Sequence, residues 1–188
     1  RAPHVTVELI AEEQSVRPGA TGTIGVHFKL DPQWHSYWLN AGDAGLSPTF
    51  EWKLPAGVTV APLPWPAPRR MMNGPVATFA YEKDVVYPFA LAVGKDVPAG
   101  PVALEVDLDW LVCDEECVPG RAHLALELVA KDAEPLKDPA RKALFEATRK
   151  AQAQPLPAGA TAKLVGETIV LELEGATTLA PSGTTGYF

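Results

Sequence analysis

The chain has no apolar stretch long enough to cross a membrane and few basic residues. Its longest strongly apolar run, residues 85–93, is interrupted by Pro88 and is much shorter than the roughly 20 residues of a membrane-spanning helix. With 16 Lys and Arg against 23 Asp and Glu, the formal net charge is −7, which is unsuited to nucleic acid or an anionic membrane surface. We therefore expect a soluble domain with no nucleic-acid partner.

Other absences exclude several classes of enzyme. The sequence has no G-x-S-x-G, H-E-x-x-H or glycine-rich phosphate loop, on which serine hydrolases, zinc proteases and nucleotide-binding proteins depend. No basic segment followed by an apolar one opens the chain, so we expect either a cytosolic protein or a mature fragment whose signal has been removed. The 19 prolines and 15 glycines indicate many turns and few long helices.

Short runs rich in β-branched and aromatic residues predict an antiparallel β-sandwich. The clearest run is residues 102–112, in which apolar side chains occupy every second position from Val102 to Trp110. Such alternation is typical of a strand with one face in the core and the other in water. Five more segments are predicted as strands by the same reasoning: residues 5–10, 22–30, 49–54, 85–93 and 122–130.

Two segments depart from this strand pattern. Residues 61–81 contain five prolines, which cannot donate ladder hydrogen bonds, together with apolar side chains, so they predict an ordered loop that covers something. After residue 130, Asp138 and Pro139 predict the start of a helix of about four turns.

A hairpin is expected at residues 161–174, with its turn at Gly166-Glu167. We therefore divide the chain into a domain of residues 1–130 and a segment of residues 131–188. The second segment is predicted to be a helical linker plus a hairpin that begins a second β domain.

The only two cysteines, Cys113 and Cys117, are the main candidates for chemistry. They flank a three-residue loop at the end of a predicted strand, where two α-carbons can approach within the roughly 4.4–6.8 Å that a disulfide requires. Closing a loop of about 5 residues stabilises a fold by only about 2 kcal/mol in the chain-entropy model. Stabilisation is thus a weak reason for the pair, but the spacing alone does not decide between redox exchange and a passive disulfide.

A metal site is another interpretation of the same residues. Two thiolates together with His123, Met71 and Met72 are soft ligands of the kind that copper(I) prefers. The residues alone therefore leave three functions open: thiol-disulfide exchange, a copper(I)-binding or copper-tolerance module, and an inert structural β domain.

Five motifs occur in the order of a known family: WHSYWLNAGDAGLSP (34–48), WKLPAGV (52–58), PWPAPRR (64–70), FAYEKDVVYP (79–88) and DWLVCDEECVPG (109–120). Together they resemble the N-terminal domain of DsbD-like protein-disulfide reductases, most closely the ScsB-type branch associated with copper tolerance. The resemblance covers about residues 5–130. It implies an immunoglobulin-like β-sandwich that lies in the periplasm as one domain of an inner-membrane protein, linked to the membrane only through segments absent from this sequence.

The resemblance also implies an enzymatic function, protein-disulfide reduction by thiol-disulfide interchange. In the family, the cysteine pair accepts electrons from a thioredoxin-like domain of the same full-length protein and reduces periplasmic thioredoxin-fold clients. Carried over by position, Cys117 is the nucleophile and Cys113 the resolving thiol. This mechanism needs no cofactor and no metal.

The family shields its pair with a cap loop, which by order along the chain comes from residues 68–81. Phe79 and Tyr81 are the candidates for shielding, with Met71 and Met72 behind them.

Four further residues are expected to modulate the pair. The acidic residues Asp114, Glu115 and Glu116 disfavour a second local negative charge, so we expect them to raise the pKa of the thiols. Tyr37 is expected either to hydrogen-bond near the pair or to pack as a core aromatic residue.

Overall fold

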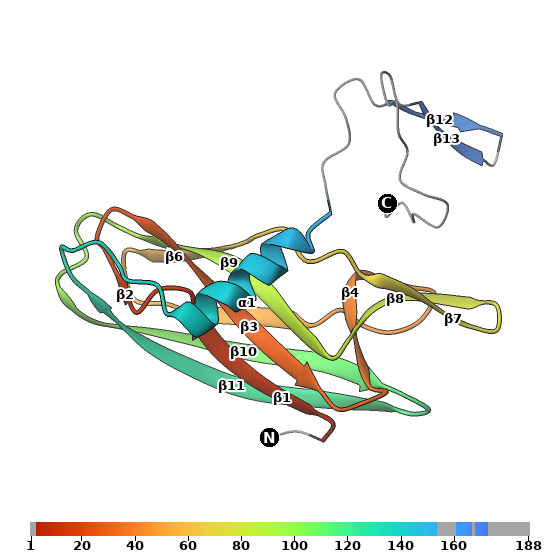
Figure 1. Cartoon of the computed structure of the whole chain (residues 1–188), viewed down its shortest axis with the longest axis horizontal. Helices are drawn as coiled ribbons and strands as arrows, with labels where there is room; N and C mark the ends of the chain where they lie inside the picture. Colours follow the sequence, from red (N-terminus) through yellow and green to blue (C-terminus); the bar gives the residue numbers. More distant parts are fainter. Residues whose placement is uncertain (1–2, 154–160, 167, 173–188) are drawn as a thin grey trace. The chain divides into compact units, whose positions relative to one another are not determined.

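The computed structural model describes residues 3–153, 161–166 and 168–172 of the chain. The chain divides into two compact units, residues 1–152 and 153–188. The first unit is a sandwich of two β-sheets with one helix on its outside (Figure 1). The prediction of an all-β, immunoglobulin-like sandwich followed by a short helix and a hairpin is confirmed.

One sheet has four antiparallel strands in the order β1-β3-β9-β6. In β9, Val85, Tyr87 and Phe89 face the other sheet, whereas Val86 faces outward. The strands are β1 (Val5–Ala11), β3 (Thr21–Leu30), β6 (Val58–Pro62) and β9 (Asp84–Val93).

The other sheet follows the order β2-β11-β10-β4-β8-β7, and β5 also pairs with β10. The β2–β11 pairing is parallel and the other pairings are antiparallel. The long hairpin of β10 and β11 keeps its register from Gly100–Ala130 to Cys113–Cys117. The strands are β2 (Ser15–Val16), β4 (His35–Gly42), β5 (Thr49–Lys53), β7 (Arg69–Asn73), β8 (Val76–Glu82), β10 (Gly100–Cys113) and β11 (Cys117–Ala130).

The hydrophobic core lies between the two sheets. Phe28 packs edge to face against both Tyr87 and Trp110. The alternate apolar side chains of β10, from Val102 to Trp110, are all buried in this core, as the sequence pattern predicts. Each fully buried side chain of this size contributes about 1.5–3 kcal/mol. Burial therefore anchors β10 firmly from Val102 to Trp110, three residues before Cys113.

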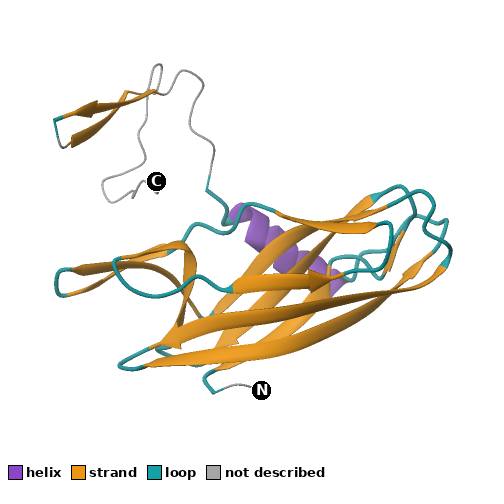
Figure 2. Ribbon diagram, turned by 180° about the vertical axis from the view of Figure 1, so that it is seen from behind, coloured by secondary structure: helices purple, strands orange, loops and turns teal. Residues whose placement is uncertain are grey.

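Helix α1 (Pro139–Lys150) covers the outer face of the four-stranded sheet (Figure 2). Its Phe145 is buried against Ile10 and Val86. As predicted, Asp138 caps the helix, and its side chain accepts hydrogen bonds from the first-turn amides. The helix belongs to the first unit, which therefore extends past the boundary that composition predicts at residue 130.

Residues 61–81 do not form one loop, so that prediction is wrong for the second half of the segment. Strands β7 and β8 form a hairpin that begins directly after Pro68. The closely spaced prolines all precede β7, and Pro75 lies in the turn, so none of them interrupts the β7–β8 ladder.

The second unit contains the hairpin of β12 (Thr161–Val165) and β13 (Thr168–Glu172). Gly166 in the turn has φ 62°, a conformation that glycine adopts at no steric cost. The hairpin is thus confirmed, whereas the second β domain stays a prediction. The end of the chain, from residue 173 onward, lies outside the described residues.

Candidate thiol-disulfide site

The two cysteines form a disulfide at the tip of the β10–β11 hairpin. Cys113 is the last residue of β10 and pairs directly with Cys117, the first residue of β11. Their α-carbons are 4.1 Å apart and their sulfurs are bonded. The backbone N–H of Asp114 donates to the carbonyl of Glu116 at 3.0 Å, which closes the three-residue loop. The hairpin itself therefore brings the two sulfurs together.

The two ends of the disulfide differ in their access to solvent. Cys113 is only 2% exposed, and it packs with Tyr37 and Ala80 in a small cluster separate from the main core. Cys117 is exposed. Because exchange requires a thiolate to approach a sulfur atom directly, Cys117 is the more accessible of the two cysteines for an incoming partner.

A cavity of about 330 Å³ lies beside the disulfide. Strand β4 contributes His35 and Tyr37, and the β7–β8 hairpin contributes both methionines and Thr78. The cavity is therefore lined by β4, by the cysteine loop and by the β7–β8 hairpin, which are far apart in the sequence.

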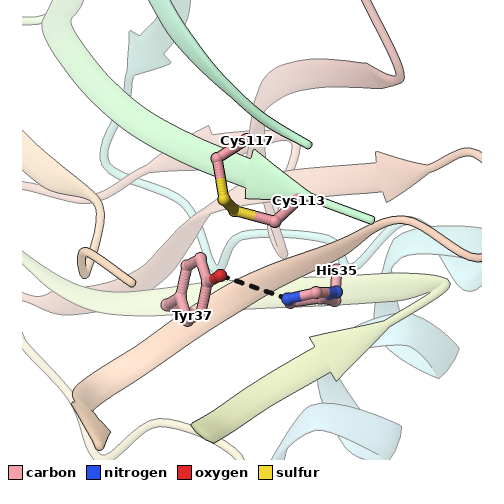
Figure 3. The surroundings of a disulfide bond; sticks show 4 residues. All are labelled: His35, Tyr37, Cys113 and Cys117. Carbon is pink, nitrogen blue, oxygen red and sulfur yellow. Dashed lines mark hydrogen bonds between the residues drawn. A yellow bond between two sulfur atoms is a disulfide. The ribbon is translucent and has the colours of Figure 1, made fainter. Parts of the chain in front are cut away.

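Tyr37 and His35 lie next to the disulfide and contact each other (Figure 3). The Tyr37 hydroxyl is 3.1 Å from Nε2 of His35, and the two rings meet edge to face. Burial raises the pKa of the Tyr37 hydroxyl and lowers the pKa of His35, an effect that the charges of Asp114 and Glu82 oppose. Near neutral pH, both side chains are therefore uncharged.

A glycine makes room for the Tyr37 ring. Gly45 has φ 102°, and a Cβ atom at this position would clash with the ring. Both the backbone conformation and the close approach therefore require glycine. Gly45 lies in the WHSYWLNAGDAGLSP motif, as Tyr37 does, so this motif holds the aromatic side chain against the site.

The structure brings some of the predicted shielding residues to the cysteines and not others. Met71 and Met72 line the cavity. Phe79 and Tyr81 do not, because side chains alternate along β8 and Thr78 occupies the face toward the cavity. Instead, Phe79 meets Trp38 edge to face, and the Tyr81 hydroxyl donates to the Pro66 carbonyl at 2.7 Å within the main core.

The three acidic residues between the cysteines are all exposed. Asp114 and Glu115 line the cavity beside the disulfide. All three, including Glu116, also line a second cavity of about 400 Å³ next to Trp34. An approaching partner would thus meet a negatively charged rim around Cys117.

His35 is a site residue that the sequence analysis missed. It pairs with Cys113 across β4 and β10, a contact between segments far apart in the chain. The one available signal was its spacing from Tyr37, since residues i and i+2 share a face of a strand.

The predicted copper ligand His123 lies elsewhere. It is in β11, six residues beyond Cys117 and thus about 20 Å along the strand, and its Nδ1 is 2.7 Å from an Asp107 carboxylate oxygen. It cannot share a metal ion with the cysteines. Within the described ranges, no three His, Cys, Asp or Glu side chains are arranged to hold a metal ion.

The fold and the site together define the class of protein. It is an immunoglobulin-like β-sandwich, without the thioredoxin fold, that carries a disulfide at an exposed hairpin tip. The family model described as "Thiol:disulfide interchange protein DsbD, N-terminal" matches residues 6–128. The chain therefore belongs to the family of DsbD N-terminal domains, whose chemistry is thiol-disulfide interchange. In the described part of the chain, no helix has the length and apolar character needed to span a bilayer.

Several solved structures match this chain, and two of them show the range of similarity. The N-terminal periplasmic domain of ScsB from Proteus mirabilis is 20% identical with a TM-score of 0.63, and the match covers 90% of this chain and 64% of that one. The reduced N-terminal domain of DsbD from Neisseria meningitidis is 12% identical with a TM-score of 0.38, and the match covers 66% of this chain and 90% of that one. Among curated proteins, none matches the chain. The ScsB comparison supports the fold expected from the sequence motifs.

Proposed function

We propose that this domain carries electrons in the periplasm between a thioredoxin-like domain of the same full-length protein and thioredoxin-fold clients. In its reduced form, the Cys117 thiolate attacks a client disulfide and forms a mixed disulfide. Cys113 then attacks Cys117, which releases the reduced client and restores the internal disulfide. The donor domain reverses this change by attacking Cys117.

One observation carries this proposal: the disulfide has one exposed and one buried end. An exposed Cys117 can form the mixed disulfide, and a buried Cys113, paired directly across the hairpin, is held ready to resolve it. A passive disulfide requires no such asymmetry. The short loop also gives the bond little stabilising value.

The β7–β8 hairpin is the proposed shield of the pair. Its Met71 and Met72 line the cavity beside the disulfide, and Met72 is 53% exposed. Met side chains are unbranched and adapt to different surroundings. We infer that the two methionines take the shielding role first assigned to Phe79 and Tyr81, and that docking of a client displaces them.

The acidic loop is proposed to keep the reduced pair from reacting before a partner docks. Negative charges at Asp114, Glu115 and Glu116 disfavour a thiolate beside them, and a thiol reacts slowly unless it ionises. A thiolate-absorbance titration tests this idea. Ionisation of Cys117 well below neutral pH would contradict it.

Trapping of the mixed disulfide tests the main proposal. The probe is a thioredoxin-fold protein whose single remaining active-site cysteine carries a 2-nitro-5-thiobenzoate group. Cys113→Ser should form a stable covalent complex with it, because Cys117 attacks and nothing resolves the product. The matched variant Cys117→Ser should form little complex, because its remaining thiol is buried. Failure of both variants to form a complex would refute the proposal.

The reduction potential separates exchange from an inert disulfide. Structural disulfides typically have potentials below about −300 mV. We expect a higher potential here, between those of the donor domain and the client, so that electrons flow through the pair.

A further inference from the structure

Cys113 must lose a proton when it resolves a mixed disulfide. Only the thiolate attacks, but Cys113 is almost fully buried, and burial disfavours the charged form of a thiol. A base close to Cys113 would remove this obstacle, and positioned bases typically accelerate proton transfer by about 100-fold or more. The two cysteines themselves provide no such group.

His35 lies at the place where such a base is needed. It is the residue directly opposite Cys113 across the β4–β10 pairing, and both residues line the cavity. Its Nε2 contacts the hydroxyl of Tyr37 at 3.1 Å, and Tyr37 belongs to the same buried cluster as Cys113. Figure 3 shows the Tyr37 hydroxyl beneath the disulfide and directed toward His35.

We propose that His35 accepts the Cys113 proton through the Tyr37 hydroxyl when the mixed disulfide is resolved. Tyr37 receives the proton from the Cys113 sulfur and passes its own proton to Nε2 of His35. The Cys113 thiolate then bonds to the Cys117 sulfur, the bond from Cys117 to the client sulfur breaks, and the electron pair leaves with the client thiolate. The client disulfide is the oxidant, and His35 is a positioning residue because it acts through Tyr37.

The surroundings of His35 suit this role. Burial keeps the imidazole neutral near pH 7, and thus able to accept a proton, by lowering its pKa. The imidazolium that forms then faces two negative charges, Asp114 from the hairpin loop and Glu82 from β8, although Arg69 of β7 pairs with Glu82. Nδ1 has no hydrogen-bond partner among the described residues, so no acceptor fixes the tautomer and Nε2 is able to change from acceptor to donor.

The test uses the reduced domain and 5,5′-dithiobis(2-nitrobenzoate), a small disulfide that releases a coloured thiolate at each of two steps. The first step is attack by Cys117 and the second is resolution by Cys113. We expect His35→Gln to leave the first rate nearly unchanged and to slow the second at least about tenfold. The matched control is His123→Gln, because His123 is a half-exposed histidine of β11 remote from the pair.

The pH profile separates proton transfer from a structural effect. With His35 present, the second rate should fall as the pH drops through the pKa of this residue, which lies below the usual 6.5. In His35→Gln this inflection should vanish, and the rate should rise with pH up to the pKa of the thiol. Should His35→Gln not fold, as judged by circular dichroism, Tyr37→Phe carries the test and should show the same slow second step.

The outcomes also separate this inference from the proposed function on which it rests. An unchanged second rate and pH profile in both variants, with normal exchange in the unaltered domain, overturns the role of His35 and leaves the exchange function intact. Absence of both steps in the unaltered domain overturns both proposals.

Discussion

The hydroxyl of Tyr87 anchors strand β4, which carries His35 and Tyr37. Its removal should lower the free energy of unfolding. Tyr87 is fully buried in β9, and its hydroxyl lies 3.0 Å from the Ser36 hydroxyl, which is also fully buried. It also donates to the backbone carbonyl of Tyr37 at 3.2 Å. Burial raises the pKa of the Tyr87 hydroxyl, so it remains a donor at any working pH. These bonds connect β9 of one sheet to Ser36 and Tyr37 of β4 in the other sheet.

Tyr87→Phe keeps the ring and removes only these hydrogen bonds. A buried polar group left unpaired costs about 1–3 kcal/mol, and a lost neutral hydrogen bond costs about 1 kcal/mol. Since Ser36 loses its partner and the Tyr37 carbonyl loses a donor, we expect the free energy of unfolding to fall by about 2–4 kcal/mol. Ser36→Ala should cost only about 1 kcal/mol, because the Tyr87 hydroxyl keeps the Tyr37 carbonyl as its acceptor.

The double variant Ser36→Ala/Tyr87→Phe provides the decisive comparison. It leaves no unpaired hydroxyl, so it should be more stable than Tyr87→Phe alone, with a coupling energy of about 1–2 kcal/mol. Urea unfolding of the oxidised domain, followed by tryptophan fluorescence, measures all four proteins. Simple additivity of the two single substitutions, or a loss below about 0.5 kcal/mol for Tyr87→Phe, would refute this reasoning.

Three further predictions concern the helix, the glycine beside the site and the disulfide. Arg149→Ala should lower the free energy of unfolding by about 2–4 kcal/mol. The side chain of Glu12 is only 2% exposed and would lose the bidentate contact, at 2.9 Å, with the Arg149 guanidinium. Thermal or urea unfolding measures the change. Gly45→Ala should displace the Tyr37 ring and slow resolution by Cys113 while leaving attack by Cys117 intact, as the two-step disulfide assay would show. Reduction of the disulfide should cost at most about 2 kcal/mol, so a reductant should lower the midpoint of urea unfolding by no more than about 1 M.

The parts of the fold with simple periodicity were predictable from the sequence. Strand β10 alternates from Val102 to Trp110 because one face is in the core and the other in water, and the Asp138-Pro139 start of α1 uses local capping chemistry. Composition does not predict strands β7 and β8, because residues 61–81 contain five prolines and only the pairing shows that these lie outside the β7–β8 ladder.

The site shows the same division between local and distant information. The pairing of the two cysteines follows from a short loop, which is a local property. The position of His35 depends on β4 pairing with the end of β10, and the orientation of Phe79 depends on the face that β8 turns toward the cavity. Both require the register between distant strands, which a single sequence does not specify.

The hairpin explains how one domain can be stable both with and without its disulfide. Fourteen residue pairs fix the register of β10 and β11 up to the cysteines themselves, and the side chains of β10 are buried in the core. Backbone pairing and burial, rather than the bond between the sulfurs, therefore hold the two cysteines opposite each other. A reduced Cys113 should remain beside Cys117, His35 and Tyr37, so the geometry for resolving a mixed disulfide is present before any client arrives.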